Sequence, residues 1–183
     1  MRRSMRDIFP VLFGERWDEA RAIFYAHFAA NHMKQLRPLL GAETLLKTLR
    51  ARGVYLAVVS NKTGRFLREE VDELGWSDHF SRLVGAGDAL FDKPATAPVK
   101  MALEPLGLTV GAQGIGHTWF VGDADIDMEC AHAARCLPVL VGGGEGSDFT
   151  QFPPAFRFDN CTALCDLISL LSEPILQGAC GAR

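Results

Sequence analysis

Hydrophobic positions in the first part of the chain recur at intervals of three and four residues. The members of this series are Ile8, Val11, Leu12, Trp17, Ala20, Ile23, Phe24, His27 and Phe28. This spacing places side chains on one face of an α-helix, so we predict helical structure throughout residues 5–36. Pro38 and Gly41 interrupt the pattern and indicate the end of this region.

From residue 42 onward, short apolar runs alternate with helical patterns. The clearest run is Val54–Val59 (VYLAVV), which is rich in β-branched residues and is typical of a strand buried on both faces of a parallel sheet. Further strands are predicted near 83–84, 118–121, 137–141 and 156–158, and helices at 42–51, 63–74, 96–106, 125–135 and 161–171.

Strands that alternate with helices favour right-handed βαβ units with helices on both faces of the sheet. We therefore predict an α/β fold with a Rossmann-like parallel sheet. The predicted organisation is a helical appendage at 1–37, an α/β core at 38–172 and a tail at 173–183.

Composition and charge narrow the classes of function. Hydrophobic residues make up 48% and charged residues 22% of the 183 positions, which is typical of a globular protein rather than a disordered one. The net charge of −3 gives no overall electrostatic case for a nucleic-acid partner. No apolar run reaches about 18 residues, so we expect no transmembrane helix and no membrane partner.

The cysteines and the N-terminal residues bear on the compartment. Five cysteines occur, none in a C-x-x-C pair, so neither a disulfide framework nor a zinc ribbon is indicated. Cys161 and Cys165 could share a helix face and hold a metal, but burial as small residues is the favoured interpretation. Acidic residues soon after Met1 argue against a secretion signal. We therefore expect reduced thiols and a cytoplasmic protein.

Polar residues follow the first predicted strand directly. In open α/β sheets, ligands bind at the carboxyl ends of the strands, so these positions are candidates for function. The segment is Ser60-Asn61-Lys62-Thr63-Gly64, and a helix is predicted after it. A hydroxyl and an amide at a helix N-terminus can hold an anion, although the same residue types also serve as ordinary helix caps.

Three acidic residues follow the predicted strand at 118–121. Asp123, Asp125 and Asp127 alternate with other residues directly after Gly122. One of them could be a helix cap, but three within five residues are better explained by a bound cation. Mg²⁺ fits this interpretation, because it takes oxygen ligands and prefers one or two carboxylates together with water and phosphate.

Between these two segments, Lys93 stands before Pro94 in a polar stretch at 85–94. A lysine there could neutralise both a phosphate and a carboxylate, although an isolated lysine is usually solvated surface. The glycine-rich segment at 142–146 does not match G-x-G-x-x-G and does not follow the first strand, so a loop is favoured over a dinucleotide site.

Three segments in this order, at successive strand ends, resemble the haloacid dehalogenase superfamily of phosphohydrolases. They are VVSNKT (58–63), VGAGDALFDKP (84–94) and WFVGDADIDMECAHAA (119–134). The chain looks most like the phosphoglycolate phosphatase-like branch, whose members carry a helical cap. The resemblance covers about 5–172.

The resemblance implies roles for five residues. The Ser60 hydroxyl and the Asn61 backbone would bind the transferring phosphoryl group, and Lys93 would steady the nucleophile and the phosphate. Asp123 would ligate Mg²⁺, and Asp127 would support the metal shell, often through water. Asp125 is a weaker candidate on the same turn.

The resemblance also implies a reaction and a moving part. The implied substrate is a small phosphorylated metabolite, either phosphoglycolate or a sugar phosphate, which is hydrolysed through an aspartyl-phosphate with Mg²⁺ as cofactor. An aspartate attacks phosphorus and a second aspartate two residues later acts as acid and base. Residues 5–36 look like the latter part of a mobile cap that excludes water, and Arg3 and Arg6 fall where some relatives contact the distal part of the substrate.

The chain departs from the family at its beginning. The aspartate pair belongs to an Asp-x-Asp-x-Thr motif after the first strand, whereas the Asp residues before residue 72 are Asp7 and Asp18, which follow no apolar strand. We therefore expect the first central strand to be missing and the cap to be partial. Three explanations fit this departure: a start further upstream in a longer, active protein; a truncated, inactive relative that binds phosphate, metal or another chain; and an unrelated flavodoxin-like binding domain.

Overall fold

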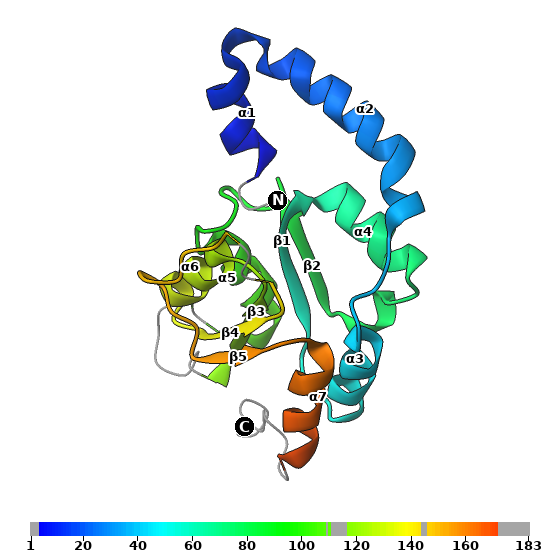
Figure 1. Ribbon diagram of the computed structural model, residues 1–183, viewed down its shortest axis with the longest axis vertical. Helices are drawn as coiled ribbons and strands as arrows, with labels where there is room; N and C mark the ends of the chain where they lie inside the picture. Colours follow the sequence, from blue (N-terminus) through cyan, green and yellow to red (C-terminus); the bar gives the residue numbers. More distant parts are fainter. Residues whose placement is uncertain (1–3, 109, 111–116, 144–145, 172–183) are drawn as a thin grey trace.

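The computed structural model describes residues 4–108, 110, 117–143 and 146–171 (Figure 1). It begins with a helical hairpin made of α1 (Met5–Phe13), the 3₁₀ turn η1 (Gly14–Arg16) and α2 (Trp17–Gln35). The predicted helix over 5–36 is therefore present but is broken at Gly14, where φ is +52°. Phe9 and Phe24 join the two helices, with ring centroids 5.8 Å apart.

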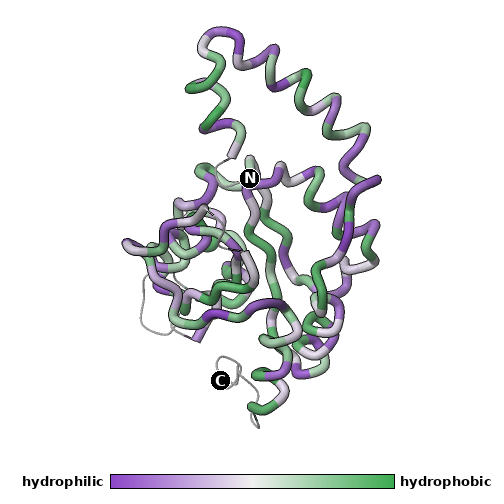
Figure 2. Tube along the Cα trace, viewed as in Figure 1, coloured by the Kyte–Doolittle hydropathy of each residue, from purple (hydrophilic) through white to green (hydrophobic). Residues whose placement is uncertain are grey.

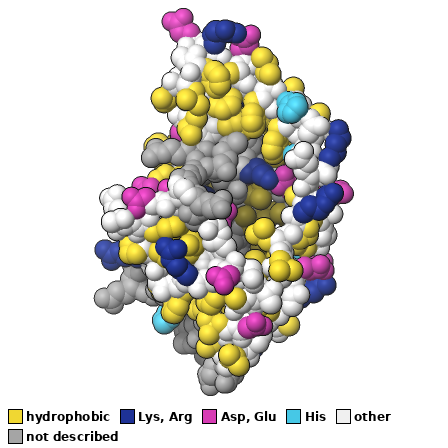
Figure 3. Space-filling model, in the orientation of Figure 1, with side chains coloured by type: hydrophobic (Ala, Val, Ile, Leu, Met, Phe, Trp, Pro, Cys, Tyr) yellow, Lys and Arg dark blue, Asp and Glu magenta, His cyan; other side chains and the backbone are white. Residues whose placement is uncertain are grey.

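The hairpin leaves part of its apolar surface uncovered within the described chain. Helix α2 alternates between hydrophobic and hydrophilic residues along its length (Figure 2). Val11, Leu12 and Ile23 are 82%, 67% and 64% exposed, and hydrophobic side chains gather on the hairpin in the view of Figure 3. The periodicity correctly predicted helices, but these three members of the apolar series are not buried.

Strands and helices alternate after the hairpin, as the sequence predicted. The elements are α3 (Ala42–Ala51), β1 (Ala57–Thr63), α4 (Gly64–Glu73), η2 (Ser77–His79), β2 (Arg82–Ala86), α5 (Ala97–Leu103), η3 (Glu104–Leu106), β3 (Trp119–Gly122), α6 (Asp125–Ala134), β4 (Leu137–Val141), β5 (Phe156–Phe158) and α7 (Cys161–Leu170). Every strand pair is parallel, which confirms the α/β fold.

The parallel strands form two sheets rather than one. One sheet has the order β1-β2, with Val59 opposite Val84, and the other has the order β3-β4-β5, with Val121 opposite Val139. Within the described chain, β1 and β3 each keep one edge without a strand partner.

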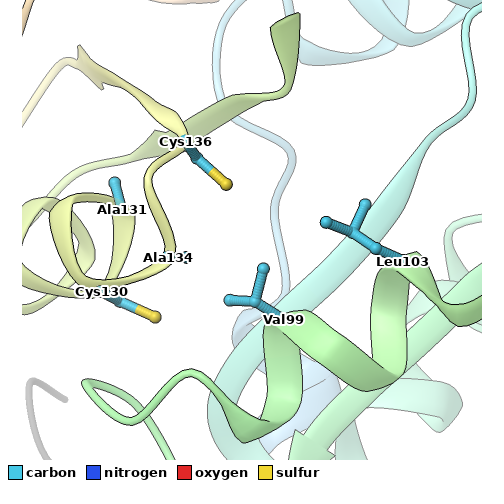
Figure 4. Packing of buried hydrophobic residues seen from close by; sticks show 6 residues of the cluster. All are labelled: Val99, Leu103, Cys130, Ala131, Ala134 and Cys136. Atoms are coloured by element: carbon cyan, nitrogen blue, oxygen red, sulfur yellow. The ribbon is translucent and has the colours of Figure 1, made fainter. Parts of the chain in front are cut away.

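Helices on one face connect the two sheets. Helix α5 packs on β1 and β2, and it also meets α6 in a hydrophobic cluster (Figure 4). The buried members of this cluster are Val99, Leu103, Cys130, Ala131, Ala134 and Cys136. Phe120 of β3 packs against the same cluster, so one layer of helices spans both sheets.

A second layer covers the other face. Helix α3, which leads into β1, contacts α7, which follows β5. The buried cluster there consists of Leu45, Val139, Val141, Leu164, Cys165 and Ile168. Arg52, just after α3, donates hydrogen bonds to the carbonyl oxygens of Ser169 and Leu171 at 3.2 and 2.9 Å. The two sheets are therefore held side by side by helices on both faces.

Strand β1 differs from its prediction in position and in burial. It was predicted at Val54–Val59 but begins at Ala57 and continues to Thr63, because backbone pairing with β2 extends to Thr63 opposite Ala86. The polar residues that were expected in a turn therefore belong to the strand, and Figure 2 shows β1 changing from hydrophobic to hydrophilic along its length. Val58 and Val59 are half-buried rather than fully buried, since β1 has a strand neighbour on one side only.

The described cysteines are free thiols in the helical layers. Cys130, Cys136 and Cys165 are buried and Cys161 is half-buried, whereas Cys180 lies outside the described residues. Burial raises the pKa of Cys130 to about 12 and that of Cys136 to about 11. None of the described helices is long and apolar enough to cross a bilayer.

Candidate functional site

The ends of β1 and β3 open into a pocket of about 600 Å³. This volume is in the range of small-molecule sites. The lining residues are Met5, Phe28, Ser60, Asn61, Lys62, Thr63, Phe66, Lys93, Asp123, Ala124, Ile126, Asp127, Gly143 and Ser147. All five residues predicted from the resemblance therefore lie around one pocket, between the two sheets and beneath the helical hairpin.

Lys93 is held in the pocket wall by its backbone and by its side chain. The Asn61 side chain donates from Nδ2 to the Lys93 carbonyl at 3.1 Å, and the Lys93 amide donates back to Asn61 Oδ1 at 3.0 Å. The Lys93 ammonium donates to Asp127 Oδ1 at 2.7 Å, with side-chain exposures of 10% and 7%. Lys93 thus links the β1 side of the pocket to the β3 side.

Asp127 is committed to contacts within the protein. Its Oδ1 accepts from Lys93, and its Oδ2 accepts from the backbone amides of Asp123 and Ala124 at 3.2 and 3.1 Å. A Cβ at Gly122 would overlap the Asp127 side chain, so only glycine allows this close approach. Because both carboxylate oxygens of Asp127 already accept hydrogen bonds, this residue could contact a cation through a water molecule rather than directly.

Asp123 is the carboxylate that remains available. Asp123 is exposed at the mouth of the pocket, and within the described chain its carboxylate has no hydrogen-bond or ion-pair partner. Asp125 does not line the pocket, and its Oδ1 accepts from the Ile126 amide at 2.9 Å. The sequence therefore places three acids on one turn, but the fold directs only Asp123 and Asp127 to the pocket.

These residues fit a magnesium site in part. Mg²⁺ is usually bound by one or two carboxylates together with water and substrate phosphate, and Asp123 can supply one carboxylate here. The described residues contain no group of three or more His, Cys, Asp or Glu side chains that could hold a metal ion. A metal bound beside Asp123 would need its other ligands from phosphate, water or further chain.

Ser60 offers a hydroxyl to the pocket. Its Oγ accepts a hydrogen bond from the Lys62 amide at 3.1 Å, which orients the oxygen and leaves the hydroxyl proton for an incoming acceptor. The hydroxyl, the Lys93 ammonium and the backbone amides at the strand end are all donors. The pocket therefore provides positive charge and hydrogen-bond donors on one side and the Asp123 carboxylate on the other.

Lys62 also lines the pocket, although the sequence analysis gave it no role. Its ammonium forms an ion pair with Glu70 of α4 and lies 5.9 Å from the centre of the Phe28 ring. The pairing register of β1 is irregular between Val59 and Thr63, so the alternation of side chains along a regular strand does not by itself place Lys62 in the pocket.

The two arginines named from the resemblance have different outcomes. Arg6 forms an ion pair with Asp92 at 2.7 Å and donates to the Leu90 carbonyl at 3.1 Å, so its guanidinium fastens α1 to the loop before Lys93. Arg6 does not line the main pocket. Arg3 lies outside the described residues.

Comparison with known sequences identifies relatives over most of the chain. The family model described as haloacid dehalogenase-like hydrolase matches residues 1–141. A phosphoglycolate phosphatase of Neisseria meningitidis is 34% identical over 134 residues, which are 72% of this chain and 54% of the relative. A phosphoglycolate phosphatase of Pectobacterium atrosepticum is 33% identical over 124 residues, 68% of this chain and 51% of the relative. The chain thus spans about half the length of these curated relatives.

Solved structures share the fold. A predicted phosphoglycolate phosphatase from Haemophilus somnus 129PT superposes with a TM-score of 0.74 at 24% identity, covering 85% of this chain and 68% of the other. A predicted phosphatase from Clostridium acetobutylicum gives a TM-score of 0.74 at 20% identity, covering 91% and 77%. At these identities the likeness establishes the α/β arrangement and its parallel strands.

Proposed function

The chain belongs to the haloacid dehalogenase-like hydrolases, and on this premise we propose that its pocket is a phosphoryl-transfer site for a small phosphate monoester. Phosphoglycolate and sugar phosphates are the proposed substrates. The relatives named phosphoglycolate phosphatase support this choice. The observation that carries the proposal is the convergence of Ser60, Lys93 and Asp123 on one pocket at the carboxyl ends of parallel strands.

The donors of the pocket suit a phosphoryl group. The Ser60 hydroxyl and the Asn61 backbone amide would donate to its oxygens, and the Lys93 ammonium would stabilise the negative charge that develops during transfer. Asp127 keeps Lys93 in place through the 2.7 Å contact, and Asn61 fixes the Lys93 backbone. These contacts fix the Lys93 ammonium at the pocket wall.

Mg²⁺ is the cofactor that we propose for this site. When bound, it would neutralise phosphate charge and orient the transferring group. Asp123 would hold it directly, and Asp127 would support it through a bound water. The available carboxylate of Asp123 and the occupied oxygens of Asp127 support this division of roles.

The proposed reaction needs a carboxylate that attacks phosphorus. Formation of an aspartyl-phosphate breaks the bond from phosphorus to the ester oxygen, and a second carboxyl group, in its protonated form, donates its proton to the leaving alkoxide. The carboxylate that remains then takes a proton from the water that attacks the aspartyl-phosphate and releases phosphate. We propose that both carboxylates belong to a strand that lies between β1 and β3, whose facing edges have no strand partner in the described chain. Residues 1–37 would act as a partial cap over the core at 38–172.

A turnover assay tests this assignment. The 183-residue chain is expected to show no Mg²⁺-dependent hydrolysis of p-nitrophenyl phosphate, because its Asp residues before position 72 do not follow a strand. In a longer form that carries the additional strand, Asp123→Ala and Lys93→Ala should each abolish hydrolysis. Robust turnover by the 183-residue chain, or retained activity in both variants, would refute the proposed site.

A non-catalytic role is the second candidate. Binding alone requires only the donors of the pocket and the Asp123 carboxylate, so the same residues would also serve a protein that binds phosphate or metal without turning it over. A ligand that binds only the folded state raises the melting temperature. A rise with phosphate and Mg²⁺, together with inactivity of the longer form, would favour this second function over the first.

A further inference from the structure

One buried carboxylate connects the helical hairpin to the wall of the pocket. Glu70 of α4 is 7% exposed. Its Oε1 accepts a hydrogen bond from His32 Nδ1 of α2 at 3.0 Å, and its Oε2 forms an ion pair with the Lys62 ammonium. Lys62 lines the pocket, and α2 is the hairpin helix that reaches α4. One carboxylate oxygen of Glu70 therefore contacts the helical hairpin, and the other contacts the pocket wall.

The His32 ring is packed against aromatic side chains of α2 and α4. Its side chain is 4% exposed and stacks on Phe28 at 4.9 Å with an interplanar angle of 12°. The edge of Phe66, on α4, meets the His32 ring at 5.0 Å. The other charged group that faces His32 in the described chain is Glu69, 3.7 Å from Nε2, which is bound to Arg65 at the surface.

A second contact holds the same stretch of α2 to the core. The Tyr25 hydroxyl and the Thr63 hydroxyl are 2.7 Å apart, and Thr63 is the last residue of β1. The Lys62 ammonium also lies beside Phe28 of α2. The position of α2 and the position of the pocket lysine are thus set by shared neighbours.

Packing alone does not explain a carboxylate at this place. Burial of an unpaired carboxylate is strongly destabilising, and an apolar residue would fill the same space without that penalty. The penalty of burying the Glu70 carboxylate is offset by one hydrogen-bond donor on the hairpin and one cation at the pocket wall. Loss of either partner leaves the carboxylate partly uncompensated, so the two contacts are expected to depend on each other.

We propose that Glu70 is a positioning residue that sets the Lys62 ammonium at the pocket wall and couples its position to the seating of α2. An anion in the pocket then meets a second cation, besides Lys93, only when the hairpin is seated. The part of this inference that concerns anions rests on the proposed function, whereas the coupling of Lys62 to α2 does not.

Hydrogen exchange tests the coupling without any ligand. Glu70→Gln keeps a carbonyl that can accept from His32 but removes the negative charge opposite Lys62; Lys62→Met removes the cation. Each variant is expected to speed amide exchange in peptides covering 25–35 by about tenfold, and the double variant by no more than either single one. Glu69→Gln, the same change one residue earlier on a more exposed side chain, is the matched control and should leave this exchange unchanged.

Phosphate binding tests the consequence for the pocket. Inorganic phosphate with Mg²⁺ is titrated into each protein by calorimetry. Lys62→Met and Glu70→Gln should each weaken binding by about fivefold to tenfold, non-additively, and Glu69→Gln should not. A residue that only supports the fold would give additive effects, because Lys62 would still contribute in the Glu70→Gln background.

The two measurements separate this inference from the proposed function. Additive effects, or a Glu70→Gln protein that behaves like Glu69→Gln, would overturn the role of Glu70 in either assay. If the unaltered chain binds no phosphate, the proposed function fails, and the exchange measurement still decides whether Glu70 couples Lys62 to α2.

Discussion

The ion pair between Lys93 and Asp127 is the contact on which the geometry of the pocket depends most. Both side chains are nearly inaccessible, and Asp127 also accepts two backbone hydrogen bonds at the start of α6. Breaking a buried pair by removing one partner is costly, because the other charge remains buried without compensation. Lys93 therefore has a structural role in addition to its proposed chemical one.

A double-mutant cycle measures this coupling. Lys93→Met is expected to lower the free energy of unfolding by about 3 kcal/mol, since Asp127 loses its cation. Combining it with Asp127→Asn should cost about 2 kcal/mol less than the sum of the single changes. Urea denaturation provides the three values, and strict additivity would show that the two side chains do not stabilise each other.

Asp88 makes the stability of the folded protein depend on pH in the acidic range. The Arg68 side chain, which hydrogen-bonds to its carboxylate at 2.8 Å, lowers the pKa of Asp88 below its ordinary value of 3.8, and the Gly85 amide adds to this effect. A lowered pKa in the folded state means that the stabilisation is fully present above the unfolded pKa and disappears as the pH falls through the folded pKa.

Comparison with Asp88→Asn isolates this contribution. At neutral pH the variant should be less stable by at most about 1 kcal/mol, because Arg68 is about half exposed and the interaction is screened by solvent. The difference between the two proteins should shrink as the pH is lowered from about 5 to below 3. Denaturant titrations of both proteins across this pH range measure the difference in stability. A difference that grows in acid would contradict the assignment of the effect to the ionised Asp88 carboxylate.

The sequence predicted which residues meet in the pocket better than it predicted how they are held. Ser60 follows the apolar run at 54–59, and Asp123 and Asp127 follow the run at 118–121, so the rule for strand ends brings these residues together. The contact between the Asn61 side chain and the Lys93 backbone joins residues 32 positions apart. No local pattern signals such a contact, because it depends on how the end of β1 and the loop after β2 are placed by the finished fold.

At the scale of secondary structure, a steric constraint explains why a glycine stands before the acidic turn. Gly122 ends β3, and the Asp127 side chain of the next helix lies where a Cβ would project. This proximity is what allows Asp127 to accept the amide hydrogen bonds of Asp123 and Ala124. The motif therefore joins strand, turn and helix into one unit.

Substitution of this glycine should destabilise the turn. Gly122→Ala is expected to cost about 2 kcal/mol, as an overpacked site does, because Asp127 and the start of α6 must shift. Gly53→Ala is a useful comparison: Gly53 has φ of +69° with open space around it, so only the backbone conformation is penalised, by about 1 kcal/mol. Equal stability of Gly122→Ala and the unaltered protein in urea would show that the turn adapts without cost.

The element boundaries show where local sequence is sufficient. Helix α3 and strands β4 and β5 have the predicted bounds, since each has a clear apolar pattern between punctuating residues. Strand β1 could not be placed correctly in this way. Its last residues are polar, and only pairing with β2 makes them part of a strand.

At the scale of the whole molecule, the pocket lies where two parallel sheets stand side by side without sharing a hydrogen-bonded edge. Helices on both faces bridge the sheets, so the space between β1 and β3 is bounded on two sides while its strand edges stay unpaired in the described chain. Unpaired strand edges are ready to accept another strand. Residues at the ends of β1 and β3, among them Ser60 and Asp123, line the same pocket.

The overall class of fold was predictable because alternation of strands and helices admits few arrangements. The division into two sheets followed only from the resemblance, which implies a further strand. The exposed positions of the hairpin were not predictable, since periodicity shows which residues share a helix face but not what covers it. Val11 and Leu12 illustrate this point, as they remain largely exposed in the described chain.

The most direct test of the account is calorimetric titration of inorganic phosphate into the 183-residue protein in the presence of Mg²⁺. The account predicts saturable binding that Ser60→Ala and Lys93→Met each weaken by about tenfold or more, as expected for the loss of a hydrogen bond or charge contact to an anion. Asp88→Asn, at a residue that does not line the pocket, should bind as the unaltered protein does. Absence of saturable binding, or equal affinity in all four proteins, would contradict the assignment of this pocket as a phosphoryl site.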